Sequence, residues 1–576
     1  GALLAADTAA TEVRLAAGRA VAIVVDFGRD VSGYPRLDLD GPAGATIDVS
    51  YCERLRDDGR AQVQRANVIT SQNVHRYILR DGEQTWEKFE RAGFRYLQLT
   101  VGPAPDRPDA PVRIRRANVN FSTYPVGSRG SFSCSDPDLT RIWNAGAYTL
   151  QLCMQDGFED CPSREQRQWA GDAYVESMVN YACFGDARLT AKEIRQVAQS
   201  QRRDGMTQMA TPGDLAATNG LYIADYCLSW IMTAGDYVLH TGDTSVVDDI
   251  FPNVVRAVAW FEHHIGDDGL LWNVPGWIFI DWAEVDKRGA AASLNALFVQ
   301  ALGHASALAG QQHATALADR WRGIAARAAA AANRLLWDEA RGVYVDALLP
   351  DGRVRRVSQQ SNAAMITSGI APRERWDRML DYVTDAERLV ETSTGFVRPP
   401  YTAIDEERQV VLAQPFFMHF VHRALAAAGR HDAIVRNIRD RWLPMLVEGG
   451  TDTFWEHWHG RDSRSHAWSA TPVYDLSREV LGVTPLAAGF ARFRVEPHLA
   501  GLTSAEGRYP TPHGEIEIAW RRAPGHFTLH LDVPPGTECE AVLPPGATSP
   551  HLDGAPAGVE ILALLPGRHA IEALLP

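Results

Sequence analysis

The sequence predicts a multidomain protein in which a central all-α domain is flanked by N-terminal and C-terminal β-sandwich domains. A chain of 576 residues is too long for a single hydrophobic core. Its first part is rich in Gly, Pro, Val and Thr, its middle is rich in Ala, Leu, Arg and Trp at helical spacing, and Gly and Pro return after Pro485. We expect a β-sandwich over 1–125, a linker over 126–134, a helical domain over 135–485 and a β-sandwich over 486–576.

The first domain is predicted from three runs in which apolar and polar residues alternate. They lie at 20–26, 45–51 and 95–101, and turn-forming residues separate them at strand spacing. Such punctuation is typical of a β-sandwich. We expect this domain to pack against the rest of the chain and to support it.

Periodic apolar residues in the middle of the chain predict twelve helices. Six helical hairpins that close into a ring form an (α/α)6 barrel, and the loops at one end of such a barrel surround a cleft. Ring closure would place the loop after the first helix next to the loop before the last. The predicted helices span residues 138–155, 171–184, 189–202, 220–241, 245–265, 291–309, 312–336, 358–368, 373–384, 414–428, 431–447 and 466–481.

The last part of the chain again reads as strands. Alternating runs occur at 491–497, 514–520, 526–533 and 539–543, and Pro-Pro-Gly occurs at 534–536 and again at 544–546. These features predict the second β-sandwich.

Net charge, apolar runs and cysteine spacing limit which partners and cellular locations are expected. A formal net charge of −14 argues against nucleic acid or an anionic membrane surface as partner. No window approaches about eighteen uncharged apolar residues, so no transmembrane helix is expected. The seven cysteines include no C-x-x-C pair and are expected to be mostly buried thiols. The chain begins at Gly1 without an initiator Met, which suggests a trimmed N-terminus and leaves a cytoplasmic or a periplasmic location open.

The densest chemistry lies at 156–172, where seventeen residues hold five carboxylates, two arginines and a tryptophan. Pro162 and two glycines exclude one long helix. One interpretation is a solvated turn in which Asp160 caps a short helix and the arginines pair at the surface. The other is a site in which neighbouring charges tune one another's pKa.

A second stretch at 451–459 favours a site. Glu456 lies there among aromatic residues, and a carboxylate held against rings either becomes protonated or requires a partner. Two acids in separate loops, both flanked by tryptophan, suit cleavage of a glycosidic bond: one carboxyl protonates the leaving oxygen while the other activates water or attacks.

The two stretches resemble the signatures of a known family. Asp-Cys-Pro-x-Arg-Glu-(x)3-Trp-x-Gly-Asp at 160–172 and Thr-Phe-Trp-Glu at 453–456 are similar to those of the inverting α-L-rhamnosidases, glycoside hydrolase family 78. Weaker matches follow in the family's order at 25–28 with Gly33, 41–44, 93–96, 281–282 and 465–468. Many relatives have further β domains, so this chain resembles a short, minimal form.

The resemblance implies roles for individual residues. Glu165 corresponds to the general acid and Glu456 to the general base. An inverting enzyme would hold their carboxyls roughly 6.5–9.5 Å apart, and a retaining one about 5–5.5 Å. Candidate substrate-binding residues are Asp160, Arg164, Trp169, Asp172, Asp225, Trp277, Asp281, Trp282, Trp455 and His466.

The same residues have simpler interpretations. Arg164 could only hold Asp160 or Asp172 in place, and any single tryptophan among sixteen is more often packed in a core. The family's Trp-x-Asp element is replaced by 221–225, which keeps Asp225 and loses the tryptophan two residues before it, so the pocket shape and the monosaccharide stay open. Histidines at 457 and 459 and at 419 and 422 raise a metal hypothesis, but ligands in metal spacing are missing, and we expect no metal or other cofactor.

The sequence therefore predicts an exo-acting inverting hydrolase that releases terminal α-L-rhamnose from a plant glycoside or polysaccharide. Two alternatives are kept. One is a carbohydrate lyase on a similar barrel, which cuts rhamnosyl-glucuronate linkages with Arg164 or Arg398 binding the uronate. The other is a non-catalytic sugar-binding protein on the same scaffold. The expected partner in each case is a carbohydrate.

Overall fold

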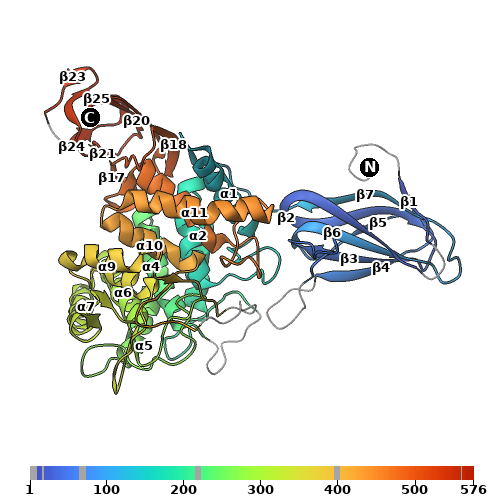
Figure 1. Ribbon diagram of the computed structural model, residues 1–576, viewed down its shortest axis with the longest axis horizontal. Coiled ribbons are helices and arrows are strands. Elements are labelled where there is room, and N and C mark those ends of the chain that lie inside the picture. The colour runs from blue at the N-terminus through green and yellow to red at the C-terminus, as the bar shows by residue number, and fades with distance from the viewer. Residues whose placement is uncertain are drawn as a thin grey trace.

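A computed structural model describes residues 10–15, 19–63, 73–213, 222–394, 403–558 and 561–575. The helices form the largest body, the N-terminal strands form a separate lobe beside it, and the C-terminal strands pack on another of its sides (Figure 1). None of the helices in the described part combines the length and apolar character that a membrane crossing needs.

The N-terminal domain is one seven-stranded antiparallel sheet that bends around its own core. Its long strand β2 pairs with β6 through its first half and with β5 and β7 through its second half. The sheet therefore folds over along β2. Side chains that alternate along the strands, such as Leu37, Val49 and Leu99, fill the core. The strands are β1 (Thr11–Val13), β2 (Val21–Gly41), β3 (Thr46–Cys52), β4 (Val74–Ile78), β5 (Gly82–Glu87), β6 (Ala92–Gly102) and β7 (Val112–Phe121).

The helices of the middle domain follow a closed circuit. Helices α2, α4, α6, α8, α10 and α12 each pack on the next, and α12 packs back on α2, while the odd-numbered helices lie outside. The helices are α1 (Pro137–Cys153), α2 (Ala170–Cys183), α3 (Arg188–Gln199), α4 (Ala224–Thr241), α5 (Ser245–Glu262), α6 (Ala292–Gln311), α7 (Thr315–Leu335), α8 (Gln359–Thr367), α9 (Trp376–Val383), α10 (Pro415–Ala427), α11 (His431–Gly449) and α12 (Thr471–Asp475). Each predicted helical range overlaps one of these.

The last predicted helix, 466–481, is the one that differs most. It is divided into a 3-10 turn (Ala467–Ala470), the short α12 and a π turn (Leu476–Val480). Pro472 at the start of α12 has no N–H for a continuous α-helical ladder, which explains the change of helix type at this point.

Short strand pairs decorate the loops of the helical domain. They are β9 (Ala290–Ala291), β10 (Trp337–Asp338), β11 (Val343–Tyr344), β12 (Ala347–Leu349), β13 (Gly352–Arg353), β14 (Leu389–Val390) and β15 (Val410–Val411). Most pair close to where they lie in sequence, and they stiffen the connections between the helices.

The C-terminal domain consists of a seven-stranded and a four-stranded sheet. The larger sheet has the order β23-β22-β25-β20-β19-β18-β8, and the smaller one β16-β17-β21-β24. Strand β8 (Ser131–Cys134) lies in the segment expected to be a linker, yet it pairs with β18 and buries Phe132. The others are β16 (Val483–Pro485), β17 (Arg492–Val495), β18 (Ser504–Thr511), β19 (Gly514–Ala523), β20 (His526–Val533), β21 (Glu538–Val542), β22 (Thr548–Leu552), β23 (Ala555–Pro556), β24 (Ile561–Leu564) and β25 (Gly567–Leu574).

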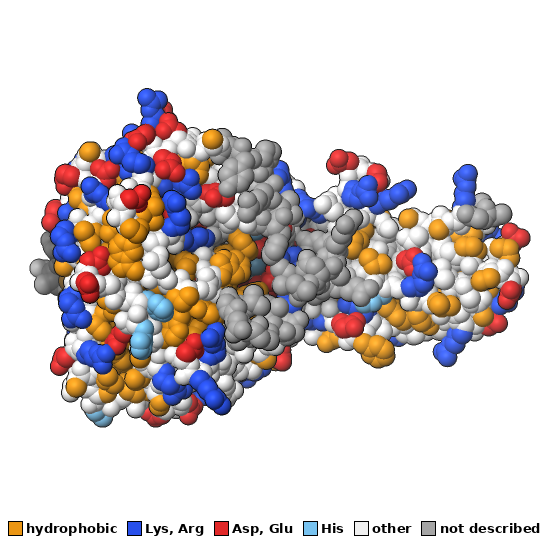
Figure 2. Space-filling model, turned by 90° about the horizontal axis from the view of Figure 1, so that it is seen from below, with side chains coloured by type: hydrophobic (Ala, Val, Ile, Leu, Met, Phe, Trp, Pro, Cys, Tyr) orange, Lys and Arg blue, Asp and Glu red, His pale blue; other side chains and the backbone are white. Residues whose placement is uncertain are grey.

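The N-terminal domain docks onto the two stretches that carry the acidic motifs. Arg91 forms a partly buried ion pair with Glu159, and Arg95 pairs with Asp26 and donates to the carbonyl of Gly450. The start of β6 lies directly against Pro162. The space-filling view is hollowed at the junction of the two lobes, and acidic side chains lie in this hollow (Figure 2).

Gly93 allows this close contact, which yields a first prediction. A Cβ at this position would lie 2.5 Å from the carbonyl carbon of Pro162. Gly93→Ala is therefore expected to push the N-terminal domain away from the motif loop and to lower the thermal midpoint, because packed backbone cannot yield without strain. Differential scanning calorimetry checks this, with Gly127→Ala, where no atom lies within 4 Å of the added Cβ, as the control. Equal melting curves for Gly93→Ala and the wild type would contradict the packing argument.

Candidate active site

The loop before α2 is held in shape by Asp160. The backbone N–H of Arg167 donates to Asp160 Oδ1 over 3.0 Å, and the backbone N–H of Asp160 donates back to the Arg167 carbonyl over 3.0 Å. The Asp160 carbonyl in turn accepts from the backbone N–H of Ala467 over 3.2 Å. Asp160 thus closes its own loop and joins it to the second motif region, which lies far along the chain.

Arg164 lies between the two glutamates. Its Nη2 donates to Glu456 Oε2 over 2.6 Å, and its Nη1 forms an ion pair with Glu165. The side chains of all three residues are at least nine-tenths buried, with exposed fractions of 5%, 7% and 2% for Arg164, Glu165 and Glu456. Ring closure therefore brings two carboxyls from distant loops to one guanidinium.

The two glutamates have opposite pKa shifts. Burial raises the pKa of Glu165 above its ordinary value, and the nearby Glu456 raises it further, although Arg164 opposes this. Burial also acts against ionisation of Glu456, but the charge of Arg164 and the backbone N–H of Ser463 together lower its pKa. The two carboxyls thus differ in how readily they hold a proton.

Each glutamate has a further hydrogen-bond partner that fixes its orientation. Trp169 Nε1 donates to Glu165 Oε2 over 3.0 Å. The backbone N–H of Ser463 donates to Glu456 Oε2 over 3.2 Å, and the backbone N–H of Glu456 donates to the Ser463 carbonyl over 2.9 Å. Each acid is held by its own loop as well as by Arg164.

Asp172 and His466 extend the cluster. His466 Nε2 lies 3.0 Å from Asp172 Oδ1, and its Nδ1 lies 3.7 Å from Glu456 Oε2. The Tyr226 hydroxyl donates to Asp172 Oδ2 over 3.2 Å. Burial lowers the pKa of His466 to about 3, and burial together with neighbouring carboxylates raises the pKa of Asp172 well above its ordinary value. His466 is therefore neutral near neutral pH.

Aromatic rings form one wall next to these acids. Phe279 contacts Tyr226, Trp277, Trp282 and Trp468, with ring centroids 5.0 to 5.9 Å apart. Trp277 is 38% exposed, so it lies at the open edge of this wall. Tyr226 also meets Trp169 edge to face. The wall has the apolar faces that suit the carbon-bound hydrogens of a sugar ring.

Three residues predicted to bind the substrate instead make contacts within the protein. Asp225 accepts the backbone N–H groups of Phe279 and Ile280, and Asp281 accepts from Trp282, Gln414 and the Gln360 side chain. These two carboxylates hold the aromatic wall in place. Trp455 packs closely against Gly449 and Gly460 and is only 6% exposed.

Three side-chain groups in the described part of the chain come close enough to hold a metal ion, but the contacts within them favour none. They are Asp160 with Cys161 and His466, His431 with Glu479 and His498, and His457 with His459 and Asp462. Burial raises the pKa of the Cys161 thiol well above its ordinary value, so no thiolate is offered. The rings of His431 and His498 stack with their centroids 3.3 Å apart, and His459 Nδ1 already accepts the Arg461 N–H.

Several residues of the site were not predicted from the sequence. Tyr226 and Phe279 carry no motif of their own, and only the fold brings their rings to the acids. Glu53, at the end of β3, reaches both motif loops and is treated below. An isolated acid after a strand gives no local signal, so sequence patterns could not have identified it.

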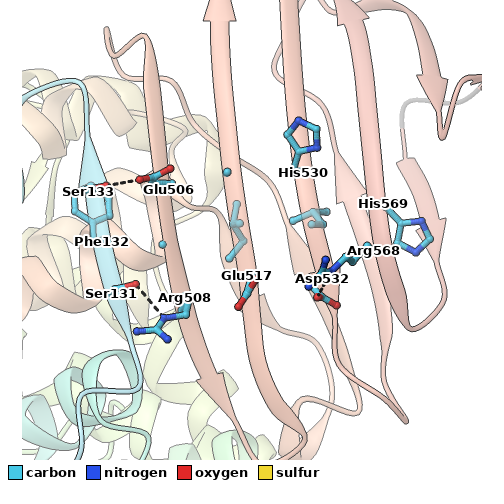
Figure 3. Close-up of a pocket in the computed structure, with 14 residues that line it drawn as sticks. Ser131, Phe132, Ser133, Glu506, Arg508, Glu517, His530, Asp532, Arg568 and His569 are labelled. Atoms are coloured by element: carbon cyan, nitrogen blue, oxygen red, sulfur yellow. Dashed lines mark hydrogen bonds and ion pairs between the residues drawn. The ribbon is translucent and has the colours of Figure 1, made fainter.

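A cavity of about 480 Å³ lies elsewhere, on the larger sheet of the C-terminal domain (Figure 3). Its charged side chains pair with neighbours, as in Ser133 donating to Glu506 and Arg568 donating to Asp532. It includes none of the predicted site residues, and the acid cluster is therefore the better candidate for chemistry.

Comparisons with known proteins match most of this architecture. Residues 128–480 match the bacterial alpha-L-rhamnosidase 6 hairpin glycosidase domain, residues 482–552 the bacterial alpha-L-rhamnosidase C-terminal domain, and residues 18–118 the bacterial alpha-L-rhamnosidase concanavalin-like domain.

Individual relatives agree with this. The GH78 family rhamnosidase of Bacillus sp. GL1 is 30% identical, with a TM-score of 0.82 over 96% of this chain and 55% of that one. The alpha-L-rhamnosidase of Streptomyces avermitilis is 23% identical over 90% of this chain and 48% of its own length. A structure of the Streptomyces avermitilis alpha-L-rhamnosidase complexed with L-rhamnose has the same fold, with 20% identity and a TM-score of 0.74 over 98% of this chain and 53% of that one.

The chain spans about half the length of the curated relatives that it matches. Its middle consists of the six-hairpin glycosidase domain, and sheet-rich domains flank it. With family matches covering most of the chain, this protein belongs to the bacterial alpha-L-rhamnosidase family of glycoside hydrolases.

Proposed function

We propose that this protein is an exo-acting inverting glycoside hydrolase that releases terminal α-L-rhamnose from plant glycosides or polysaccharides. The observation that carries the proposal is the shared guanidinium of Arg164, which holds Glu165 and Glu456 on its two sides while their pKa values shift in opposite directions. Two carboxyls with separated pKa values are what acid and base catalysis of glycoside cleavage requires.

In the proposed mechanism Glu165, protonated in its buried setting, donates its proton to the glycosidic oxygen as the bond to the leaving group breaks. Glu456, kept ionised by Arg164, accepts a proton from the water that attacks the anomeric carbon from the opposite face. The neutral His466 and Asp172 beside Glu456 bind sugar hydroxyls. Trp169 positions Glu165, and Trp277 and Trp282 bind the apolar face of the sugar.

The finer features of the fold belong to this proposal. The closed circuit from α2 through α12 supports an (α/α)6 barrel, whose loops at one end carry Glu165 and Glu456. The folded-over N-terminal sheet and the two C-terminal sheets support a β-sandwich on each side. A bound L-rhamnose in the Streptomyces avermitilis structure and rhamnose in one from Klebsiella oxytoca support the choice of sugar.

The two alternatives receive less support. A lyase requires free cationic groups for a uronate carboxylate, whereas Arg164 is taken up by two glutamates, and Arg398 lies outside the described residues. A non-catalytic sugar-binding protein has no need for two buried acids of opposite pKa shift, because burying unused charge is unfavourable.

The substrate and the stereochemistry are tested together with 4-nitrophenyl α-L-rhamnoside and a panel of other 4-nitrophenyl sugars. We expect release of nitrophenol from the rhamnoside alone, with the β-anomer of rhamnose formed first in the proton NMR spectrum. Prior appearance of the α-anomer would exclude inversion. An unsaturated product that absorbs in the ultraviolet from a rhamnosyl-glucuronate substrate would instead support the lyase.

The roles of the two glutamates are separated by leaving-group dependence. Glu165→Gln should lower kcat by about 10²–10⁴-fold on a natural glycoside, whose poor leaving group requires a proton, and by much less on the nitrophenyl rhamnoside. Glu456→Gln should lower kcat strongly on both substrates, because water activation is needed in each case. Circular dichroism controls for folding. Equal losses for the two variants on both substrates would contradict the assignment.

Arg164 should set the acidic limb of the pH profile. A group with a lowered pKa stays ionised until the pH falls through that pKa, so activity should fall at low pH as Glu456 is protonated and at high pH as Glu165 loses its proton. Arg164→Lys cannot hold two carboxylates with one ammonium group. The pKa of Glu456 should therefore rise and the acidic limb of kcat/KM should move to higher pH.

The control for Arg164→Lys is Arg188→Lys, which changes a surface pair with Asp186. It should leave both limbs in place. An acidic limb that stays put in Arg164→Lys would mean that another group keeps Glu456 ionised.

A further inference from the structure

Glu53 connects the N-terminal domain to both catalytic loops. It follows β3 directly and its side chain is buried between the two lobes. Ser163 Oγ donates to Glu53 Oε1 over 2.9 Å, and Ser463 Oγ donates to the same oxygen over 3.3 Å. The backbone N–H of Arg464 donates to Glu53 Oε2 over 2.9 Å. One carboxylate thus accepts donors from two loops that are about three hundred residues apart in sequence.

The groups that Glu53 holds lie next to the catalytic array. Ser163 immediately precedes Arg164. Ser463 forms a two-way backbone pair with Glu456, donating to its carboxylate over 3.2 Å and accepting its N–H over 2.9 Å. Glu53 therefore holds the residue next to Arg164 in one loop and the residue bonded to Glu456 in the other.

Neighbouring contacts keep Glu53 in this position. Arg54, the next residue, donates to the carbonyls of Gly460 and Arg461 over 3.0 and 2.7 Å. On the same side, the Thr453 hydroxyl donates to Asp30 over 3.2 Å. The N-terminal domain thus contacts the Glu456 loop at several points, and only Glu53 among these residues also contacts the loop of Glu165.

We propose that Glu53 is a positioning residue for catalysis, and that the N-terminal sheet domain completes the active centre by holding the two acid loops in register through it. This inference rests on the proposed hydrolase function. A shift of about 1 Å between catalytic groups is enough to lower a rate by about 100-fold. Loss of the buried carboxylate that bonds to both loops is therefore expected to lower kcat.

The geometry predicts different outcomes for two substitutions. In Glu53→Gln the amide oxygen can accept the Arg464 N–H, and the amide nitrogen can donate to the serine hydroxyls, since hydroxyls both donate and accept. The single hydrogen of the Ser463 hydroxyl is shared between Glu53 Oε1 at 3.3 Å and the Ser465 carbonyl at 2.9 Å, so the hydroxyl can turn fully to the carbonyl and accept from the new amide. Glu53→Ala removes all three contacts at once.

The test compares kcat, KM, the pH profile and amide hydrogen exchange of the full chain. Glu53→Ala should lower kcat on 4-nitrophenyl α-L-rhamnoside by about 10- to 100-fold with a small change in KM. It should move the acidic limb to higher pH, because Glu456 loses a well-placed Ser463 N–H. In Glu53→Ala the rate of amide hydrogen exchange should rise in residues 160–169 and in residues 454–466. Glu53→Gln should stay within a few-fold of the wild type in each measurement.

Two controls separate positioning from general docking. Arg95→Ala loosens the lobe contact at Gly450 without touching either acid loop's serines, and Glu83→Ala changes an exposed acid on the same domain. Neither should move the acidic limb. If Glu53→Ala does not fold, Ser163→Ala combined with Ser463→Ala replaces it, because this pair removes both serine contacts, leaves Glu53 only the Arg464 N–H, and so breaks the link to the Glu165 loop.

Several results would overturn the inference. They are an unchanged kcat in Glu53→Ala, an equal loss in Glu53→Gln, or the same limb shift in Arg95→Ala. An inactive wild type would refute the proposed function, and the exchange data would still decide the inference, since coupled loosening of the two loops does not depend on turnover.

Discussion

The buried guanidinium of Arg164 is the interaction on which the site depends. Burying two carboxylates without a cation is strongly unfavourable, and removing one partner of a buried charge pair costs about 3–5 kcal/mol. Arg164 satisfies Glu165 and Glu456 together and also fixes the distance between their loops. The helical circuit, the loop closure by Asp160 and the docking of the N-terminal domain all serve to bring these three side chains to one place.

Burial and neighbouring charges shift the pKa values of Glu165 and Glu456 in opposite directions. Both glutamates are buried, and the difference between their pKa values comes from their other neighbours. The charge of Arg164 and a backbone N–H of Ser463 lower the pKa of Glu456, whereas the charge of Glu456 raises the pKa of Glu165 against the opposing effects of Arg164 and Trp169. Asymmetry in a few contacts is enough to separate the pKa values of two neighbouring carboxyls.

Residues that do not touch Glu165 or Glu456 hold the loops and rings around them in place. Asp225 and Asp281 bind the backbone of the loop that carries the aromatic wall, so they act on the pocket through Phe279 and its neighbours. Gly93 lets β6 approach Pro162, and Glu53 bridges the two loops from the same domain. The flanking lobe thus contributes to the geometry of the pocket as well as to the stability of the chain.

The sequence by itself determined the helices, because apolar periodicity and helix propensity are local properties that neighbouring residues fix together. It also identified Glu165 and Glu456, since the motifs that surround them are contiguous. Only the tertiary structure decided what each group contacts: that Trp455 packs on glycines, that Asp225 and Asp281 bind backbone, that β8 joins the C-terminal sheet, and that Glu53 accepts hydrogen bonds from both acid loops. These contacts join residues far apart in the chain, and their free energy depends on packing that no local pattern contains.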